Sequence, residues 1–392
     1  MQTVKKILEI YLISYLVFLT GSYSQPFRSD VYIASYIVLG VLTVIWFVFS
    51  LVREKRVVLP EYFGLYILLF LSGIVSTLFS VNIPLSVQEL YLWVTYLVLF
   101  LGTMNLVGYG WNGKSFLNSL MVVGVSFNLY RLAEEVSMYL AQINVCKRMD
   151  SPNKTAAFSN ILMMLALFAF MKRKGRAKIF PGLVVLSSAA VLTATASRGG
   201  IVASSAGIVV FFVVSYLYGK IDLRKDWLIL LAAAALIVVP AVSVLFTAPP
   251  EVCTSRWTKK NITRVGYLEY GLAIAGKYPV NGSGLNTFQY LAKPVMGKKA
   301  AHPHNIFLRV LTERGFVGSV ISAGFLLGLL ASLLFDTKDV YIKAAGLGLL
   351  ALFLVHGLVD VTGKEPFVMR YMALAMGFIF SSNSNFGGSE ND

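Results

Sequence analysis

Two of the three histidines in this sequence, His302 and His304, stand two residues apart in a polar stretch of a mostly apolar chain. A neutral imidazole can take a proton from a hydroxyl nucleophile near physiological pH, so either histidine is a candidate general base. His304 directly precedes Asn305, where a helix is expected to begin, and is the better placed. From spacing alone, a structural role for it is an equal alternative. The two histidines flank a proline, and no carboxylate or cysteine stands near them in the sequence, so we expect no metal site.

Two arginines are placed to hold an anionic ligand. Arg198 lies in the short segment Thr193–Gly200 between two apolar runs, so its guanidinium is expected at a membrane boundary. The neighbouring glycines leave backbone room for a ligand, and small residues allow helices to approach closely. The alternative is an arginine that only extends to the membrane interface. Arg264 opens a predicted loop helix and has the fork that best fits phosphate oxygens, with a solvated surface arginine as its alternative.

Polar side chains inside apolar runs are costly in a membrane, which makes them candidates for function. His356 and Asp360 are one helical turn apart near the end of a run, so we expect a buried polar pair or an ion relay. Arg370 in the last run needs a partner, for which Asp360 is a candidate. Arg131 and Glu134 are expected simply to pair with each other. The sequence has no P-loop, GxSxG, HExxH or paired-carboxylate signature, so ATP hydrolysis, serine hydrolase and zinc protease chemistry have no support.

A helical bundle in a membrane must position these residues. Hydrophobic residues make up 57% of the 392 residues, charged residues only 14%, and the mean hydropathy is +0.72. That is too little polar surface for a soluble globule. The apolar residues form runs long enough for membrane-crossing helices, unlike the short alternating segments of a barrel. We therefore predict an all-α integral membrane protein with about twelve transmembrane helices. The runs lie at roughly 7–24, 31–52, 62–80, 88–107, 115–140, 155–171, 180–195, 200–218, 227–247, 316–335, 343–362 and 366–382.

Loop charges predict the orientation of this bundle. The net charge of +15 raises the question of nucleic acid binding, but basic cytoplasmic loops account for much of it, and we expect no nucleic-acid partner. The positive-inside rule places both termini in the cytoplasm, and the first run, which lacks a cleavage site, is interpreted as a retained helix. The expected organisation is nine helices in residues 1–247, a long extracytoplasmic catalytic loop at 248–315, three helices at 316–382 and a flexible cytoplasmic tail at 383–392. The long loop carries ten Lys and Arg residues, an excess that an anionic ligand on the outer face would explain.

The long loop contains signals for two short amphipathic helices. A helix capped by Asn261 is predicted to run to Lys277, with Val265, Leu268 and Leu272 at helical spacing. Asn281-Gly282-Ser283-Gly284 predicts a turn. A second helix begins at His304 or Asn305 and has a wide apolar face. Both helices are too short and too charged to span, so we expect them on the bundle or at the membrane surface, on two sides of a cavity.

The two cysteines, Cys146 and Cys253, both fall in loops placed outside. In an oxidising compartment they could form a disulfide that ties the long loop to the loop after the fifth span. Two free thiols are the alternative, and the sequence leaves the choice open, because it does not fix the distance between the two Cα atoms.

Several of these motifs follow one another in a fixed order between about residues 190 and 375. They are Thr195-Ala196-Ser197-Arg198-Gly199, Arg264 leading to Lys277-Tyr278-Pro279, Gly282-Ser283-Gly284, and His302-Pro303-His304-Asn305 followed by Leu308, Glu313 and Gly315-Phe316-Val317-Gly318. In this order, with one long outer loop before the tenth span, they resemble the O-antigen ligase and O-antigen polymerase superfamily. Over the first 180 residues only hydropathy matches, apart from an echo of a family loop in Arg148 through Asn153.

The resemblance implies a GT-C-like bundle and an inverting, metal-independent glycosyltransferase without a cofactor. Its donor would be a glycan on undecaprenyl diphosphate, presented at the periplasmic face of the bacterial inner membrane. Arg198 and Arg264 would hold the diphosphate, and His304 would act as general base on the acceptor hydroxyl. Four further polar residues are candidates for supporting roles: His302, Asn305, Asp360 and Arg370.

The acceptor distinguishes several activities that the resemblance leaves open. A ligase of lipopolysaccharide biosynthesis would move the glycan to lipid A-core, a polymerase would add it to another lipid-linked glycan, and a protein O-glycosyltransferase would use serine or threonine. No residue separates these activities, and we favour the ligase slightly. A transporter of the lipid-linked glycan is an alternative of another class. It would place charges near the membrane midplane and show internal repeats, whereas the charges here gather on the outer side.

Overall fold

The computed structural model describes Ile13 and residues 59–108, 112–140, 152–222, 224–246, 265–296, 302–361 and 365–385. All regular elements in these ranges are helices, and none of the described residues forms a strand. The all-helical fold class is therefore confirmed for the described part of the chain.

Ten of the twelve predicted spans fall on described residues, and each coincides with a helix. They are α3 (Phe63–Leu78), α4 (Ile83–Gly108), α5 (Gly113–Leu140), α6 (Pro152–Lys172), α7 (Ile179–Thr195), α8 (Arg198–Leu217), α9 (Trp227–Phe246), α12 (Ile306–Ala331), α13 (Val340–Val359) and α14 (Pro366–Asn385). Seven helical segments of the described chain are long and apolar enough to cross a membrane, and α3, α9 and α14 provide shorter apolar stretches. The chain is thus a multi-pass membrane protein. The total of twelve spans stays a prediction, because apart from Ile13 the first two predicted runs lie outside the described residues.

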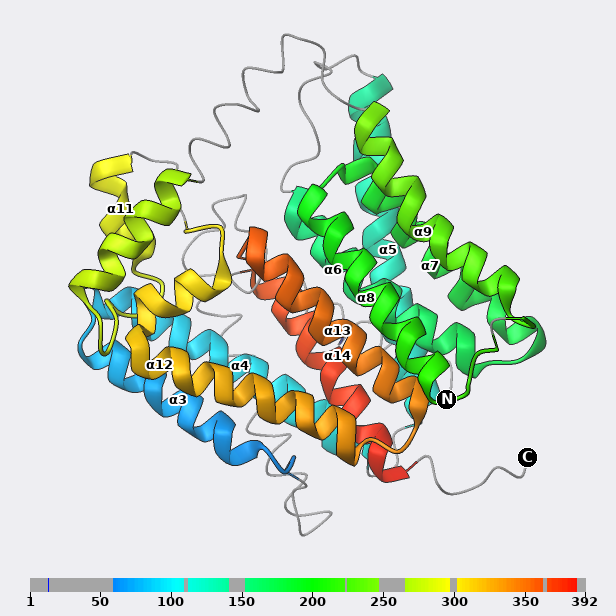
Figure 1. Cartoon of the computed structure of the whole chain (residues 1–392), viewed down its shortest axis with the longest axis horizontal. Helices are drawn as coiled ribbons and strands as arrows, with labels where there is room; N and C mark the ends of the chain where they lie inside the picture. Colours follow the sequence, from blue (N-terminus) through cyan, green and yellow to red (C-terminus); the bar gives the residue numbers. More distant parts are fainter. Residues whose placement is uncertain are drawn as a thin grey trace.

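The helices form two groups on either side of a central pair (Figure 1). On one side lie α3, α4 and α12, on the other side α5 to α9, and between them run α13 and α14. The pair connects the groups because α13 packs on α8 and α14 packs on α4. α6 is deeply enclosed, with Thr155–Ala169 buried along its length. Phe158 of α6 contacts Tyr371 of α14 with their ring centroids 4.4 Å apart, in the middle of this apolar core.

The long loop contains more helix than expected. Residues 265–277 are helical, as predicted, although Asn261 lies outside the described residues. An additional helix, α11 (Phe288–Met296), follows the turn. Tyr267 and Ile274 form a small apolar cluster with Phe288. The residues of the first helix noted at helical spacing are instead on its exposed side: Val265, Leu268 and Leu272.

α12 has a break at Gly315, where the predicted second loop helix meets the predicted tenth span. Gly315 has φ 65° and ψ −167°, a region essentially restricted to glycine. A break leaves backbone groups without partners inside the helix, and the preceding turn supplies them. The amides of Ser283 and Gly284 donate to the carbonyls of Thr312 and Glu313, and the amides of Phe316 and Val317 donate to the carbonyls of Pro279 and Val280. The turn thus binds both parts of α12.

Replacing Gly315 by alanine is expected to lower the free energy of unfolding by about 1–3 kcal/mol. A Cβ at Gly315 would lie 2.2 Å from the carbonyl oxygen of Val280, and the backbone conformation is unfavourable for alanine. Gly324→Ala in the same helix is the matched control, because a Cβ there meets no heavy atom within 4 Å. The control should be neutral or slightly stabilising, since alanine favours helix. Thermal unfolding of both variants in detergent measures the difference, and equal midpoints would contradict it.

Candidate functional site

His304 stands at the start of α12, held by the residue that caps this helix. The side-chain Oδ1 of Asn305 accepts a hydrogen bond from the amide of Leu308 at 2.9 Å and caps α12, which begins where the sequence predicted a helix start. Its Nδ2 donates to the carbonyl of Leu358 at 3.1 Å, near the end of α13. Asn305 therefore supports the site by joining the start of α12 to the end of α13. His304 itself has a positive φ of 52°, outside the helical region.

The imidazole of His304 is oriented by a carboxylate. Its Nδ1 lies 3.1 Å from Oδ1 of Asp360, just beyond the end of α13. A carboxylate can only accept, so Nδ1 carries the proton and Nε2 keeps the lone pair that a general base needs. The side chain of His304 is 29% exposed and that of Asp360 only 11%, so the base reaches solvent while its partner is enclosed.

Asp360 is held in its charged form by its neighbours. Burial alone would raise the pKa of this carboxyl. The hydrogen bond with His304, the charges of His302 and His304, and the hydrogen bond from the amide of Val361 instead hold the pKa below its ordinary value. Asp360 is thus ionised at neutral pH and can stabilise a positive charge on His304 when that imidazole takes a proton.

A chain of hydrogen bonds links the base to the helix that carries Arg198. Asn153, at the start of α6, donates through Nδ2 to Oδ2 of Asp360. Its Oδ1 accepts from Oγ of Ser197 at 2.8 Å, and that Oγ caps α8 by accepting from the amide of Gly200 at 3.1 Å. Arg198 is the exposed first residue of α8. The predicted base and one predicted diphosphate-binding arginine therefore belong to one connected site.

Four of the helices that begin at this end of the bundle are linked by side-chain contacts: α6, α8, α12 and α14. Asn153 of α6 contacts Ser197, which precedes α8, and Asp360, which in turn contacts His304 just before α12. An ion pair of 2.7 Å between Lys154 and Glu365 joins α6 to the start of α14. Helix N-termini carry partial positive charge, and their first amides can bind anions. With Arg198 beside them, they make this end of the protein suited to a negatively charged group.

The start of α8 packs too closely against its neighbours for larger residues. A Cβ at Gly199 would lie 2.6 Å from Cγ2 of Val359 in α13, and one at Gly200 would lie 2.5 Å from Cβ of Ala156 in α6. Gly199 therefore lets α8 approach the end of α13 before Asp360, and Gly200 lets it approach α6, as their small size suggested.

His302 completes a cluster with the base and its carboxylate. Its ring centroid is 4.3 Å from that of His304, and its Nδ1 is 3.9 Å from Oδ1 of Asp360. The possible ligand atoms of these three residues lie within 4.8 Å of one another, a set that fits a transition metal. The expectation that no carboxylate completes the histidine pair is therefore wrong. Sequence spacing failed because Asp360 is brought in by folding from another helix.

The expected side-chain hydrogen bond between His356 and Asp360 does not form. Asp360 leaves the helix with φ −157° and ψ 165°, which turns its side chain away from His356 towards His304 and Asn153. His356 is fully buried in α13, and only its carbonyl bonds to Asp360, through the backbone amide. Arg370 is fully buried in α14, and its pairing with Asp360 stays a prediction. By contrast, the pair of Arg131 and Glu134 is confirmed, at 2.5 Å.

Three predicted features lie outside the described residues: Arg264, Cys146 and Cys253. The role of Arg264 and the choice between a disulfide and free thiols therefore stay predictions. The described part of the loop helix does reach the site, because the ring centroid of Tyr267 lies 5.3 Å from that of His304. Neither Tyr267 nor Asn153 was singled out as a site residue, and for Asn153 the only signal was its place in the echoed family loop.

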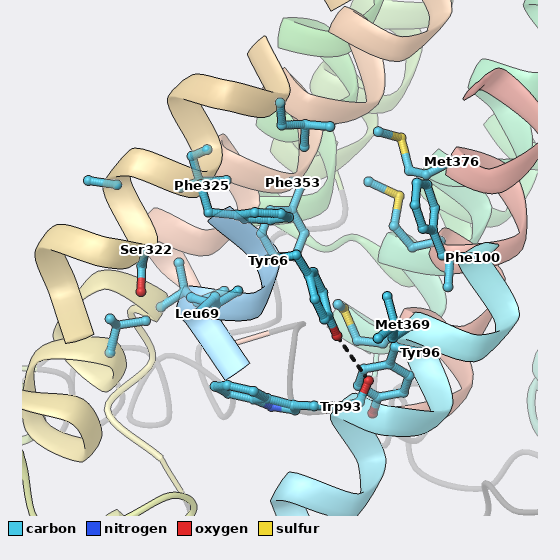
Figure 2. Close-up of a pocket in the computed structure, with 18 of the residues that line it drawn as sticks. Tyr66, Leu69, Trp93, Tyr96, Phe100, Ser322, Phe325, Phe353, Met369 and Met376 are labelled. Atoms are coloured by element: carbon cyan, nitrogen blue, oxygen red, sulfur yellow. Dashed lines mark hydrogen bonds between the residues drawn. The ribbon is translucent and has the colours of Figure 1, made fainter. Parts of the chain in front are cut away.

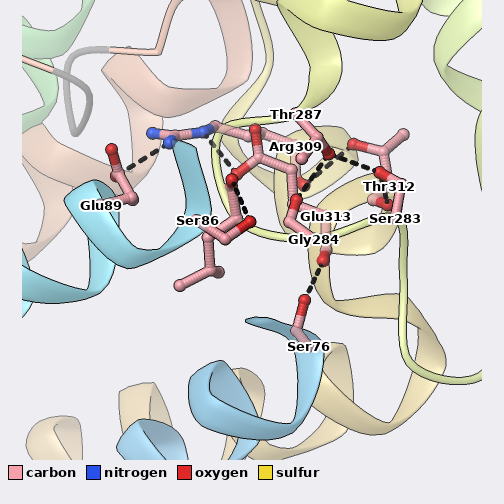
Figure 3. A network of polar contacts seen from close by, with 10 residues as sticks. Ser76, Ser86, Glu89, Ser283, Gly284, Thr287, Arg309, Thr312 and Glu313 are labelled. Carbon is pink, nitrogen blue, oxygen red and sulfur yellow. Dashed lines mark hydrogen bonds and ion pairs between the residues drawn. The ribbon is translucent and has the colours of Figure 1, made fainter. Parts of the chain in front are cut away.

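A buried ion-pair network holds the first part of α12 in place (Figure 3). Arg309 lies between two carboxylates, with Nη2 2.8 Å from Glu89 of α4 and Nε 3.0 Å from Glu313 of its own helix. Oγ of Ser76 in α3 donates to the carbonyl of Glu313 at 2.5 Å. The helix that begins after His304 is therefore bound to α3 and α4. The i, i+4 spacing of Arg309 and Glu313 was visible in the sequence, but the contact with Glu89 was not.

A comparison with known protein families finds a match for the segment that carries most of these features. Residues 182–323 match the family model described as O-antigen ligase. The segment runs from α7 into α12 and includes Arg198, Arg264 and His304, whereas Asp360 lies beyond it. The resemblance to the O-antigen ligase and polymerase superfamily is therefore confirmed. A search of curated proteins found no match to the sequence.

Proposed function

We propose, from the premise that residues 182–323 of this membrane protein match the family model described as O-antigen ligase, that the chain transfers a glycan from undecaprenyl diphosphate to an acceptor hydroxyl. The reaction takes place on the periplasmic face of the bacterial inner membrane, with both termini in the cytoplasm. The observation that carries the proposal is the hydrogen bond between His304 and Asp360, which orients a base inside the matched segment.

In this proposal His304 is the general base. Nε2 takes the proton of the acceptor hydroxyl while Asp360 holds Nδ1 and stabilises the imidazolium that forms. The acceptor oxygen attacks the anomeric carbon from the side opposite the diphosphate, and the bond between that carbon and the phosphate oxygen breaks. This geometry inverts the configuration of the anomeric carbon. Asp360 and Asn153 are positioning residues, because they act on the substrate only through His304.

The leaving diphosphate needs fixed positive charge. Arg198 and the first amides of α8 supply it at one side of the site, and a guanidinium in a region of low dielectric stabilises the developing charge without a metal ion. Arg264 is proposed to hold the same diphosphate on the basis of the family resemblance. The cluster of His302, His304 and Asp360 is assigned to proton transfer because the family resemblance implies a metal-independent reaction, and the contact of Nδ1 with Asp360 leaves Nε2 of His304 to act as the base.

Arg198→Ala is expected to lower the rate of transfer about 10- to 100-fold even at high donor concentration, the effect of losing a hydrogen bond from a charged donor. Arg176→Ala is the matched control, because Arg176 is also exposed but lies before the start of α7 instead of after its end. The control should transfer glycan at the rate of the unchanged protein. Initial rates at saturating donor measure both, and an equal rate for Arg198→Ala would remove its proposed role.

The acceptor is proposed to be lipid A-core, which makes the protein an O-antigen ligase. The test is incubation of the purified protein with a defined undecaprenyl-diphosphate glycan in EDTA, with and without lipid A-core, followed by analysis of product size. One shifted lipopolysaccharide product supports a ligase. A product ladder without added acceptor would instead show a polymerase, and activity that needs a divalent cation would overturn the metal-independent mechanism. Movement of intact donor across vesicles without transfer would support the transporter alternative.

A further inference from the structure

His302, His304 and Asp360 form a compact set of ligands for a transition metal. Their possible ligand atoms lie within 4.8 Å of one another. Nδ1 of His304 and Nδ1 of His302 lie 3.1 and 3.9 Å, respectively, from Oδ1 of Asp360. In a tetrahedral zinc site, bonds of roughly 2.0–2.1 Å place neighbouring ligand atoms about 3.3 Å apart. The two distances lie on either side of this value, so a zinc ion fits between the three residues after small movements of the side chains.

The carboxylate of this set is already oriented by hydrogen bonds from outside it. Asn153 donates to Oδ2 of Asp360, and the backbone amide of Val361 donates to Oδ1. Hydrogen bonds of this kind hold the ligands of metal sites in place and strengthen metal binding. Both imidazoles are partly exposed, whereas Asp360 is buried. An ion can therefore reach the set from solvent, and a carboxylate in a region of low dielectric then binds it.

The set is separate from a second buried group of charged residues in the described chain. Glu89, Arg309 and Glu313 line a large apolar cavity between α3, α4 and α12, which Figure 2 shows from close by. In that group Arg309 forms ion pairs with both carboxylates, so the group does not attract a further cation. The two histidines and Asp360 do not line this cavity. A metal ion bound by them would therefore lie outside it.

The types of ligand select the metal. Imidazole nitrogens suit Zn²⁺, Cu²⁺ and Ni²⁺, whereas Mg²⁺ and Ca²⁺ prefer sets of oxygen atoms. Two histidines and one carboxylate leave the fourth position of a tetrahedral zinc ion open to water. When both imidazoles are neutral, Asp360 gives the set a charge of −1, so a bound divalent ion leaves a net positive charge. This charge does not repel the anionic donor proposed to bind at Arg198, so metal and donor can be bound together.

A metal on Nδ1 of His304 changes what Nε2 can do. A neutral imidazole carries one ring proton. In the metal-free site this proton is on Nδ1, which donates to Asp360, and Nε2 keeps its lone pair. When Nδ1 instead binds a metal through its lone pair, the single proton must be on Nε2. Nε2 is then a hydrogen-bond donor and cannot take a proton from a hydroxyl.

We propose that His302, His304 and Asp360 bind Zn²⁺ and that the bound ion inhibits the protein by blocking the base. The binding of zinc follows from the arrangement of the ligands, whereas the inhibition rests on the proposed function. The ion is thus an inhibitor of a reaction that itself needs no metal. His302 separates the two roles, because it binds the metal but takes no proton in the proposed reaction.

Calorimetric titration of the full-length protein with ZnCl₂ tests the site. The protein should carry no histidine tag, and Cys146→Ser with Cys253→Ser removes the two thiols as competing ligands. We expect one zinc ion to bind per chain and to raise the midpoint of thermal unfolding, because it binds the folded state. MgCl₂ should do neither. Absence of zinc binding, or equal binding of magnesium, would overturn the proposal.

His302→Ala should weaken zinc binding at least about 100-fold, since the loss of a ligand costs more than the loss of a residue that only orients one. His356→Asn is the matched control, because His356 is buried in α13 and does not belong to the set. The control should keep its affinity for zinc. Thermal unfolding without metal confirms that both variants fold, and equal zinc affinity in the His302 variant and its parent would refute the site.

X-ray absorption at the zinc edge gives a measurement that needs no histidine variant. In the chain with both cysteines replaced, zinc should have nitrogen and oxygen ligands at roughly 2.0–2.2 Å and show the scattering of imidazole rings. Ligation by oxygen atoms alone would overturn the proposal.

Initial rates of glycan transfer at fixed free zinc test the inhibition. Saturating zinc should lower the rate about 100-fold or more, as the loss of a general base does, without weakening donor binding. EDTA should restore the rate. The transfer that remains in His302→Ala should persist at zinc concentrations that inhibit the unchanged chain. Undiminished transfer by protein fully loaded with zinc would overturn the inhibition.

The outcomes separate this inference from the proposed function. Zinc binding by these three residues in a protein that transfers no glycan would support the metal site and contradict the transferase. Glycan transfer by a protein that does not bind zinc at these residues would support the transferase and overturn the metal site.

Discussion

His304→Ala is expected to reduce glycan transfer about 100- to 10,000-fold, the usual contribution of a general base. Nδ1 of His304 is committed to Asp360, so the loss of Nε2 removes the acceptor for the hydroxyl proton. The change should leave donor binding nearly intact, because the proposed anion site at Arg198 is formed by other side chains. Initial rates and donor affinity, measured separately on the same preparation, give both numbers.

His302→Ala is the control for this prediction. His302 belongs to the same cluster, but its Nδ1 is 3.9 Å from Asp360, too far for a hydrogen bond. Its removal should therefore cost much less than the removal of His304. If the His304 variant transfers glycan normally, or if the two variants lose activity equally, the assignment of the base is wrong.

Arg309→Met is expected to destabilise the protein by about 3–5 kcal/mol, the cost of breaking a buried ion pair by removing one partner. Arg309 neutralises Glu89 and Glu313, and the side chains of all three are less than a tenth exposed. Methionine fills a similar volume but leaves two buried carboxylates without their cation. Thermal or denaturant unfolding in detergent measures the loss.

Two further variants separate this cause from a general effect of losing a basic residue. Lys225→Met removes an exposed cation 3.7 Å from Asp222, a pair of little expected worth, and should leave stability unchanged. Combining Arg309→Met with Glu89→Leu and Glu313→Leu removes all three charges and should recover most of the loss. An Arg309→Met protein as stable as the unchanged chain would show that the network contributes little.

The elements of this fold were predictable because their signals are local. Long apolar runs predicted each described membrane helix, and the start of α12 was predicted at His304 or Asn305 because helix-start signals depend on neighbouring residues. The orientation of the helix at residues 265–277 was harder to predict from the sequence, because the side of it that is buried depends on the elements that it packs against. Thus Tyr267 contacts His304 while Leu268 is exposed.

Only some residues of the candidate site could be predicted from the sequence. Arg198 and His304 stood out because a charged or titratable residue is unusual at its position in an apolar chain. The prediction that Asp360 pairs with His356 was wrong. Helical spacing suggested this pair, but the helix ends at Asp360, so the two side chains do not lie on one helix face. Asn153 bonds to a residue 207 positions away, and no spacing rule connects positions so distant in the chain.

The turn that contains Gly282 and Gly284 is hydrogen-bonded to α12 on both sides of the break at Gly315. Its four backbone hydrogen bonds hold both parts of the helix, so the angle between the segment that follows the proposed base and the membrane span is set before any substrate arrives. Such preorganisation avoids the cost of assembling the base around each new acceptor. It also means that α12 is not the part that adapts to the acceptor. Selectivity among acceptor sugars should therefore reside in residues that contact the sugar, and can change without altering how the base is held.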